Sequence, residues 1–238
     1  KILTFNMELL MFYKNLNTYI MKKLMFLLMF LYVGILSVSC DDLVDKDDTN
    51  ELTGAQSNMG LAGVSVSSSS AEIAGVSDFS ATVESLEDGI SSYTAQATIT
   101  NTVLKNMISN FPGVVIDGNI ASIDNLQIKQ TTDGIKCVTG PFAGVLVNYG
   151  SSVGDTYTTA TAGKVRKVVS KTGEDDYPYG FYLIKTIQVE STVGNSNLVS
   201  GISKITYIAN HRFGMVGVKI DFEDGTSTTF PIYTSAEN

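Results

Sequence analysis

The sequence predicts an all-β fold built from antiparallel strands, and three observations lead to this prediction. Residues 41–238 contain 20 Val, 16 Ile and 22 Thr but only 9 Leu, and side chains branched at Cβ favour strands over helices. Several segments alternate apolar and polar residues with a period of two. Finally, no segment has the pattern of an amphipathic helix of ordinary length, and strands do not alternate with helices as a parallel sheet would require.

Candidate strands follow one another closely along the chain, separated by short turns. Glu87-Asp88-Gly89 and Thr132-Asp133-Gly134 each predict the turn of a hairpin. A short helix of at most two turns is predicted over residues 102–109, because Asn110-Phe111-Pro112-Gly113 ends the apolar pattern there. The strands expected before the last hairpin cover residues 79–84, 93–100, 126–128, 135–138, 142–148, 164–170, 181–189 and 202–209.

The clearest hairpin lies near the C-terminus. Val216, Val218, Ile220 and Phe222 occupy every second position, which predicts that they share one buried face. A turn at residues 223–225 follows, and the alternation resumes in the last strand. Pro231 lacks an N–H donor, so that strand is expected at a sheet edge or to be locally irregular.

Two architectures fit this order of strands: an antiparallel β-barrel and a two-sheet β-sandwich. Near-neighbour turns favour the up-and-down barrel. The stretch from Asn110 to Ile128, in which Asn-Phe-Pro-Gly leads into Gly118-Asn119-Ile120, resembles the calycin-like domains of small lipoproteins of the Bacteroidota. That resemblance also implies a barrel.

The N-terminal region predicts export from the cytosol. Lys22 and Lys23 precede a 13-residue apolar run from Leu24 to Leu36, which has the order of a signal peptide and is short for a membrane-spanning helix. Residues 1–20 precede this signal and are interpreted as a spurious upstream extension. An ordinary cleaved signal and an uncleaved anchor are the alternatives to the lipoprotein signal described next.

Cys40 closes the predicted signal peptide, which covers residues 21–40. The small residues before Cys40 resemble the lipobox of bacterial lipoproteins, in a loose form similar to that of the Bacteroidota. This resemblance implies that Cys40 carries lipid and anchors the protein in the outer membrane. Stable anchoring needs more than one acyl chain, and the lipid of such a cysteine supplies them.

Residues 41–77 are predicted to form a tether, acidic at first and then rich in Ser, before a single β-rich domain over residues 78–238. Within the tether, Val64-Ser65-Val66-Ser67 alternates and is a candidate first strand. Six acidic residues fall between Asp41 and Glu51. This cluster resembles the signal that sends Bacteroidota lipoproteins to the cell surface. Asp41 directly after the cysteine also resembles the proteobacterial signal for retention in the inner membrane. The loose lipobox favours the cell surface.

Charge excludes one class of partner. Residues 41–238 hold 12 basic and 23 acidic side chains, a net charge of −11, and such a chain is repelled by nucleic acid. The membrane, reached through the N-terminal lipid, and a small molecule, a glycan or an envelope protein remain as possible partners. No cofactor and no metal site are predicted.

The loop that contains Glu174, Asp175, Asp176, Tyr177 and Tyr179 is the candidate ligand or partner site. Its carboxylates could bind calcium, and its tyrosines could stack on a sugar or dock a protein. The simpler interpretation, which we favour, is an acidic hairpin tip whose tyrosines cover the edge of a sheet.

The sequence contains two features that are typical of hydrolases, and neither predicts a catalytic site. Gly150-Ser151-Ser152-Val153-Gly154 matches the G-x-S-x-G pattern of serine hydrolases, but the residues that follow do not predict a helix, so a turn is expected. His211 is the single histidine of the chain and is expected in a loop. No catalytic residue is predicted.

These observations predict a non-enzymatic, lipid-anchored binding module of the cell envelope. A structural or assembly component of the envelope is the first alternative, and a hydrolase with paired carboxylates is the second. An apolar cavity with a few polar groups would favour the binding module. One long unpaired strand edge would favour the assembly component, and two carboxylates facing each other in a cleft would favour the hydrolase.

Overall fold

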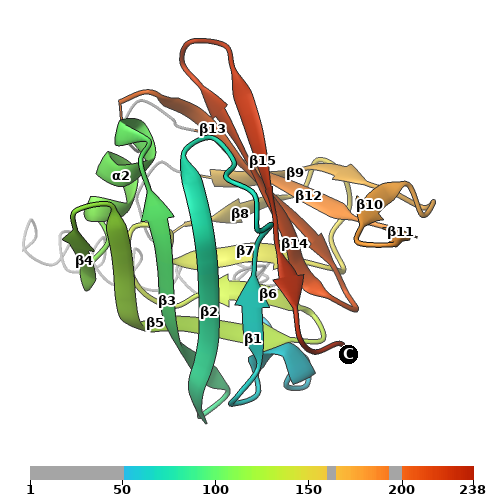
Figure 1. Cartoon of the computed structure of the whole chain (residues 1–238). Coiled ribbons are helices and arrows are strands. Elements are labelled where there is room, and N and C mark those ends of the chain that lie inside the picture. Colours follow the sequence, from blue (N-terminus) through green and yellow to red (C-terminus); the bar gives the residue numbers. More distant parts are fainter. Residues whose placement is uncertain (1–50, 160–164, 193–199) are drawn as a thin grey trace, which may run out of the picture. The chain divides into compact units, whose positions relative to one another are not determined.

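A computed structural model describes residues 51–159, 165–192 and 200–238 (Figure 1). The chain divides into two compact units, Lys1–Asp48 and Thr49–Asn238. The first unit, which includes the predicted upstream extension, the signal peptide and Cys40, lies outside the described residues. All that follows concerns the second unit.

The second unit is mostly β. Its first large sheet contains β1 (Ser65–Ser67), β2 (Val76–Glu87), β3 (Ile90–Ile99), β4 (Val114–Asp117), β5 (Ile120–Thr131), β6 (Gly134–Cys137), β7 (Gly144–Asn148) and β16 (Tyr233–Thr234). The other large sheet contains β8 (Thr156–Thr158), β9 (Val165–Lys171), β12 (Ile187–Thr192), β13 (Ile202–Asn210), β14 (Gly214–Phe222) and β15 (Ser227–Pro231). The hairpin of β10 (Tyr177–Tyr179) and β11 (Tyr182–Ile184) stands apart from both, and the helices are η1 (Asn58–Gly60) and α2 (Thr102–Ser109).

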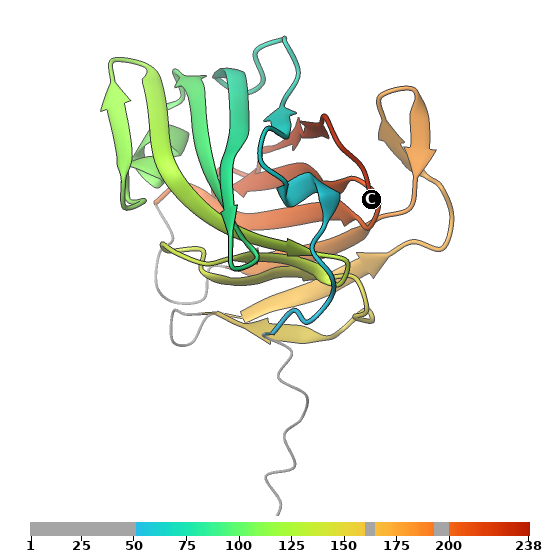
Figure 2. The ribbon, with the colours of Figure 1, turned by 90° about the horizontal axis from the view of Figure 1, so that it is seen from below.

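Every strand pair in these sheets is antiparallel. The first sheet has the order β16-β1-β2-β3-β5-β6-β7, with β4 paired to β5, and the second has the order β15-β14-β13-β12-β9-β8. Strands β2, β3 and β5 bend strongly, so the first sheet curls like half of a barrel (Figure 2). The chain passes directly from β15, at the edge of the second sheet, to β16, at the edge of the first, with Ile232 alone between them. The chain also passes from β7, the other edge of the first sheet, to β8, the other edge of the second.

The main core lies between the two sheets. Its fully buried members include Val145 and Val147 from β7 and Val168 and Val189 from β9 and β12. Side chains of a strand point alternately to opposite faces, so the inward parity of both sheets supplies this core. Helix α2 adds Leu104, and the side chain of its N-cap residue Asn101 accepts a hydrogen bond of 3.1 Å from the backbone N–H of Leu104.

The hairpins predicted from turn chemistry are confirmed. Strands β2 and β3 turn at Asp88 and Gly89, which both have positive φ angles, and β5 and β6 turn immediately before Gly134. Two consecutive residues with positive φ make the two-residue turn that matches the twist of the strands. The short helix over residues 102–109 is also present, and β15, which Pro231 ends, is an edge strand.

The tether predicted over residues 41–77 is wrong for residues 51–77, which belong to the folded unit. The side chain of Leu52 is 1% exposed, and Gln56 forms an isolated bridge with Thr131. Strand β1 pairs with both β2 and β16. The Ser-rich composition suggested a tether, but the candidate strand at Val64-Ser65-Val66-Ser67 is confirmed by β1, and Val64 and Val66 pack against a buried cluster of Ala81, Val83, Tyr93 and Ala95.

Two other predictions need correction. The strand predicted over residues 181–189 is two strands, because the chain leaves the β10–β11 hairpin after Ile184 and joins the second sheet at Ile187. Val216 does not share its cluster with the other three alternating residues of β14. Val218, Ile220 and Phe222 contribute to the main core, whereas Val216 packs with Tyr179. A β-bulge lies in β14 at Val216 itself, because Ile208 pairs with Gly217 and Ala209 pairs with Met215, which leaves Val216 without a partner on β13.

Candidate functional site

A cavity of about 310 Å³ opens between the curled sheet, helix α2 and strands β14 and β15. This volume lies at the lower end of the range for small-molecule pockets. Apolar side chains make most of the wall. They are Val76, Phe79, Ala95, Ala97, Ile99, Leu104, Met107, Ile108, Val114, Ala121, Ile123, Val218, Ile220, Phe230, Pro231 and Ile232.

The polar lining residues are few and uncharged. They are Ser68, Ser69, Ser77, Gln96 and Ser122. Gln96 is exposed and the four serines are half-buried, so the polar groups lie toward solvent. The wall is therefore suited to an apolar body and offers a few hydrogen-bonding groups near its rim.

Local irregularity in β2 positions one wall of the cavity. The register between β2 and β3 shifts between Ser77 and Ser80, and Asp78 has a φ of 53°. Aspartate tolerates this left-handed conformation better than most residues. A β-bulge redirects the side chains beside it, and here Phe79 lines the cavity.

A second cavity of about 200 Å³ adjoins the first, because Phe79 and Ile232 line both. Its wall includes a buried polar pair, Tyr93 and Gln130, whose side chains are hydrogen-bonded to each other. The Tyr93 hydroxyl also donates to the carbonyl oxygen of Met59 at 3.2 Å. Burial raises the pKa of Tyr93 to about 12, although the bond from Gln130 acts in the opposite direction.

The residues of the loop predicted as the ligand or partner site have different surroundings in the structure. Glu174, Asp175 and Asp176 are exposed before β10. Tyr179 is buried, with its ring centroid 4.8 Å from that of Phe213 and 5.4 Å from that of Tyr233.

Tyr177 also packs against the folded unit. It is half-buried beside the buried cluster of Tyr179, Ile208 and Val216, and its hydroxyl lies beside Gly217 in β14. The two tyrosines therefore pack on the second sheet, whereas the three carboxylates precede β10 and do not form the tip of the hairpin, so the acidic hairpin tip of the simpler interpretation is wrong.

Sequence reasoning missed the exposed tip of the same hairpin. The side chain of Phe181 is 105% exposed, and Tyr182 and Leu183 are also largely exposed. The signal was present as three adjacent large apolar residues directly after Gly180, a glycine with a positive φ of 58° that is typical of a turn.

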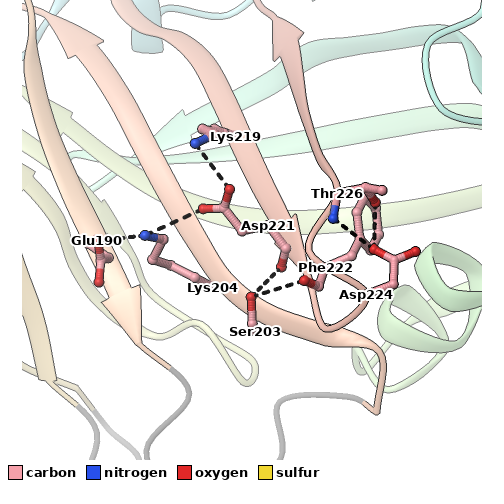
Figure 3. A network of polar contacts seen from close by, with 8 residues as sticks. All are labelled: Glu190, Ser203, Lys204, Lys219, Asp221, Phe222, Asp224 and Thr226. Atoms are coloured by element: carbon pink, nitrogen blue, oxygen red, sulfur yellow. Dashed lines mark hydrogen bonds and ion pairs between the residues drawn. The ribbon is translucent and has the colours of Figure 1, made fainter.

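An ionic network on the second sheet brings two carboxylates, those of Glu190 and Asp221, to the same lysine (Figure 3). The Lys204 ammonium lies 3.2 Å from Glu190 and 3.5 Å from Asp221, and Lys219 lies 3.0 Å from Asp221. Because Lys204 stands between the two carboxylates, they face a cation and not a shared substrate position. Neither carboxylate lines the cavities described above.

The remaining candidate motifs stay apart from these cavities. Residues 150–154 form a turn-rich connection between β7 and β8, and no helix follows Ser152. His211 is exposed in the turn between β13 and β14. Within residues 51–159, 165–192 and 200–238, no group of three or more His, Cys, Asp or Glu side chains could hold a metal, and no helix could cross a membrane.

Comparison with known proteins assigns no family to the chain. No family model matches the sequence, and no match was found among the curated proteins or the solved structures. The arguments that follow therefore rest on the geometry of the site.

Proposed function

We propose that the protein is a non-catalytic binding module that holds a small, largely apolar molecule between its two sheets. The observation that carries this proposal is the apolar cavity of about 310 Å³. An apolar cavity of about 150 Å³ stays dry and binds benzene, so twice that volume suits a ligand of about a dozen non-hydrogen atoms. Removing such a molecule from water contributes the main part of its binding free energy.

The site belongs to a cell-envelope protein in this proposal. The lipobox-like residues before Cys40 support a lipid anchor in the outer membrane, and the acidic run after it supports display on the cell surface. Radiolabelled palmitate incorporated by wild type, and lost in Cys40→Ser, tests the anchor. Protease shaving of intact cells tests the surface location, because an inward-facing protein would be protected.

We further propose that the two sheets form a flattened, calycin-like barrel. Two connections between sheet edges support it, one from β7 to β8 through residues 149–155 and one from β15 to β16 through Ile232 alone. Amide hydrogen exchange tests this closure. Protection of the outward N–H groups of β7 and β8 is expected for a barrel, whereas rapid exchange on both strands would favour a sandwich.

Ligand binding is tested with N-phenyl-1-naphthylamine, a neutral dye that fluoresces in apolar surroundings. Since the chain lacks Trp, dye emission is a better reporter than intrinsic emission. Ala97→Phe, which fills the first cavity, is expected to weaken dye binding at least about tenfold. Ala81→Phe is the matched control, because Ala81 lines only the second cavity and lies on the neighbouring strand.

Circular dichroism confirms that each variant is folded before its binding is compared. Equal dye binding by wild type and a folded Ala97→Phe would refute binding in the first cavity. Equal loss in both folded variants would place the dye across both cavities and not in the first alone.

An assembly component of the envelope is the second candidate function. The exposed tip of Phe181, Tyr182 and Leu183 favours it, because adjacent exposed apolar side chains often mark contact sites. Co-purification of an envelope protein that is lost on Phe181→Ser, with dye binding unchanged, would support this candidate.

A further inference from the structure

We propose that the cavity selects molecules without negative charge and that Asp78 at its edge contributes to the rejection of anions. This inference rests on the proposed binding function and deepens it. It concerns the charge of the ligand, which the sequence alone does not predict.

The wall of the first cavity offers nothing to pair with an ionised group. Among its lining residues in the described part of the chain there is no Asp, Glu, Lys, Arg or His. Burying an ionised carboxylate without a partner is far more unfavourable than burying an alcohol or an ester. An anionic head group would therefore have to remain at the rim, in water.

The lysine of helix α2 does not compensate for this. Lys105 follows the lining residue Leu104, but its ammonium donates to the carbonyl oxygen of Gly118 at 3.0 Å and to Oδ1 of Asn119 at 2.8 Å. These bonds hold it on the turn between β4 and β5. Lys105 is not among the residues that line the cavity.

The charge at the edge of the cavity is negative. Asp78 lies between Ser77 and Phe79, two lining residues, and its carboxylate accepts a hydrogen bond of 2.8 Å from the Ser77 hydroxyl. Asp78 is exposed, so its carboxylate remains in solvent beside the wall. A carboxylate head group at this rim would meet a like charge, and two like charges repel even when water screens them.

Methyl dodecanoate and dodecanoate test the inference, because both have the same acyl chain and only one is charged. Each competes with N-phenyl-1-naphthylamine for the purified full chain, kept in solution with an amphipathic polymer. Dodecanol serves as a second neutral competitor, and Ala97→Phe provides the blank for molecules bound elsewhere. We expect the neutral competitors to displace the dye at least about tenfold more strongly than dodecanoate.

Asp78→Asn then tests the role of the carboxylate. Asparagine tolerates the same positive φ, so the β-bulge is preserved. The affinity for dodecanoate is expected to rise about two- to fivefold, while that for dodecanol stays constant. Asp175→Asn is the matched control, because it removes an exposed carboxylate from the distant loop before β10 and should change neither affinity.

The outcomes separate the two proposals. If no competitor displaces the dye and the dye binds Ala97→Phe as well as wild type, the binding function itself is refuted. Equal displacement by dodecanoate and its methyl ester would leave that function standing and overturn the selection against anions. A neutral preference that Asp78→Asn leaves unchanged would overturn the part assigned to Asp78.

Discussion

Arg166 in β9 donates a hydrogen bond of 2.8 Å from Nη1 to the carbonyl oxygen of Val145 in β7. Its Nη2 donates to the carbonyl oxygen of Phe142 at 2.6 Å, and its guanidinium carbon lies 5.6 Å from the centroid of the Tyr207 ring. The side chain is 1% exposed. A single buried cation thus joins the second sheet to the first, and carbonyl oxygens together with an aromatic face take the place of a carboxylate.

Arg166→Met is expected to lower the free energy of unfolding by about 2–4 kcal/mol, because it leaves the two carbonyl oxygens without donors in the interior. Urea unfolding followed by far-UV circular dichroism measures this. Lys167→Met is the matched control, since Lys167 is the exposed neighbour on the same strand, and its effect should stay within about 0.5 kcal/mol. Equal stability of the two variants would contradict a bridging role for Arg166.

The successful predictions from sequence were mostly those that depend on a few neighbouring residues, such as turns and the end of a helix. The turn at Asp88-Gly89 depends on residues that adopt positive φ, Gly134 after the next turn leaves no room for a side chain, and the end of the helix depends on Pro112, so each leaves a signal within a few residues. The predominance of β-strands also followed from the high content of Val, Ile and Thr. Strand boundaries and faces failed where bulges or long-range pairing decide, as for Val216 and for the residues around β1.

The cavity left no comparable signal. Val76 and Phe230 face it from distant parts of the chain, and nothing in either local pattern distinguishes a residue beside a void from one in a filled core. Such a space results from how the curled sheet lies against the other sheet, which is a property of tertiary packing. Arg166 likewise carries no local sign of its burial, because it lies among other basic residues in the sequence, yet it is buried.

Buried tyrosines should make the protein less stable at high pH. Burial raises the pKa of Tyr93 to about 12, and it also raises the pKa of Tyr149 and Tyr207. Because a tyrosine of the unfolded chain ionises near pH 10, the stability from neutral Tyr93 is complete below pH 10 and is lost as the pH rises from about 10 to 12. One such group accounts for about 1.4 kcal/mol between pH 9 and pH 11.

Urea midpoints measured at pH 9, 10 and 11 test this dependence. Tyr93→Phe should lower stability at pH 9, since it removes the bonds to Gln130 and Met59, and should flatten the decline between pH 9 and pH 11. Tyr182→Phe is the control, because Tyr182 is exposed and its removal should leave the decline as in wild type. The same slope in Tyr93→Phe and wild type would show that Tyr93 ionises normally.

Two substitutions in the β10–β11 hairpin should differ in their effect on stability, because Tyr179 is packed and Phe181 is exposed at the tip. Tyr179→Ala is expected to cost about 3 kcal/mol, because its ring packs against Phe213 and Tyr233. Phe181→Ala, two residues away, should change the free energy of unfolding by less than about 0.5 kcal/mol. Thermal unfolding of both variants distinguishes these effects, and a large loss in Phe181→Ala would mean that the tip is covered in solution.

Phe79 is expected to set the length of ligand that the first cavity accepts, because it is the largest side chain that lines both cavities. In wild type, the affinity for straight-chain alcohols should rise up to about dodecanol and then level off. Each methylene that fits contributes about 0.8 kcal/mol, so in Phe79→Ala the rise should continue to hexadecanol.

The truncation costs stability, up to about 3 kcal/mol, so binding is compared at a temperature where both proteins are folded. Phe213→Ala is the matched control, since Phe213 lines the second cavity alone and its loss leaves Phe79 in place. A folded Phe79→Ala whose affinity still levels off at dodecanol, or an equal extension in Phe213→Ala, would show that another side chain limits the ligand.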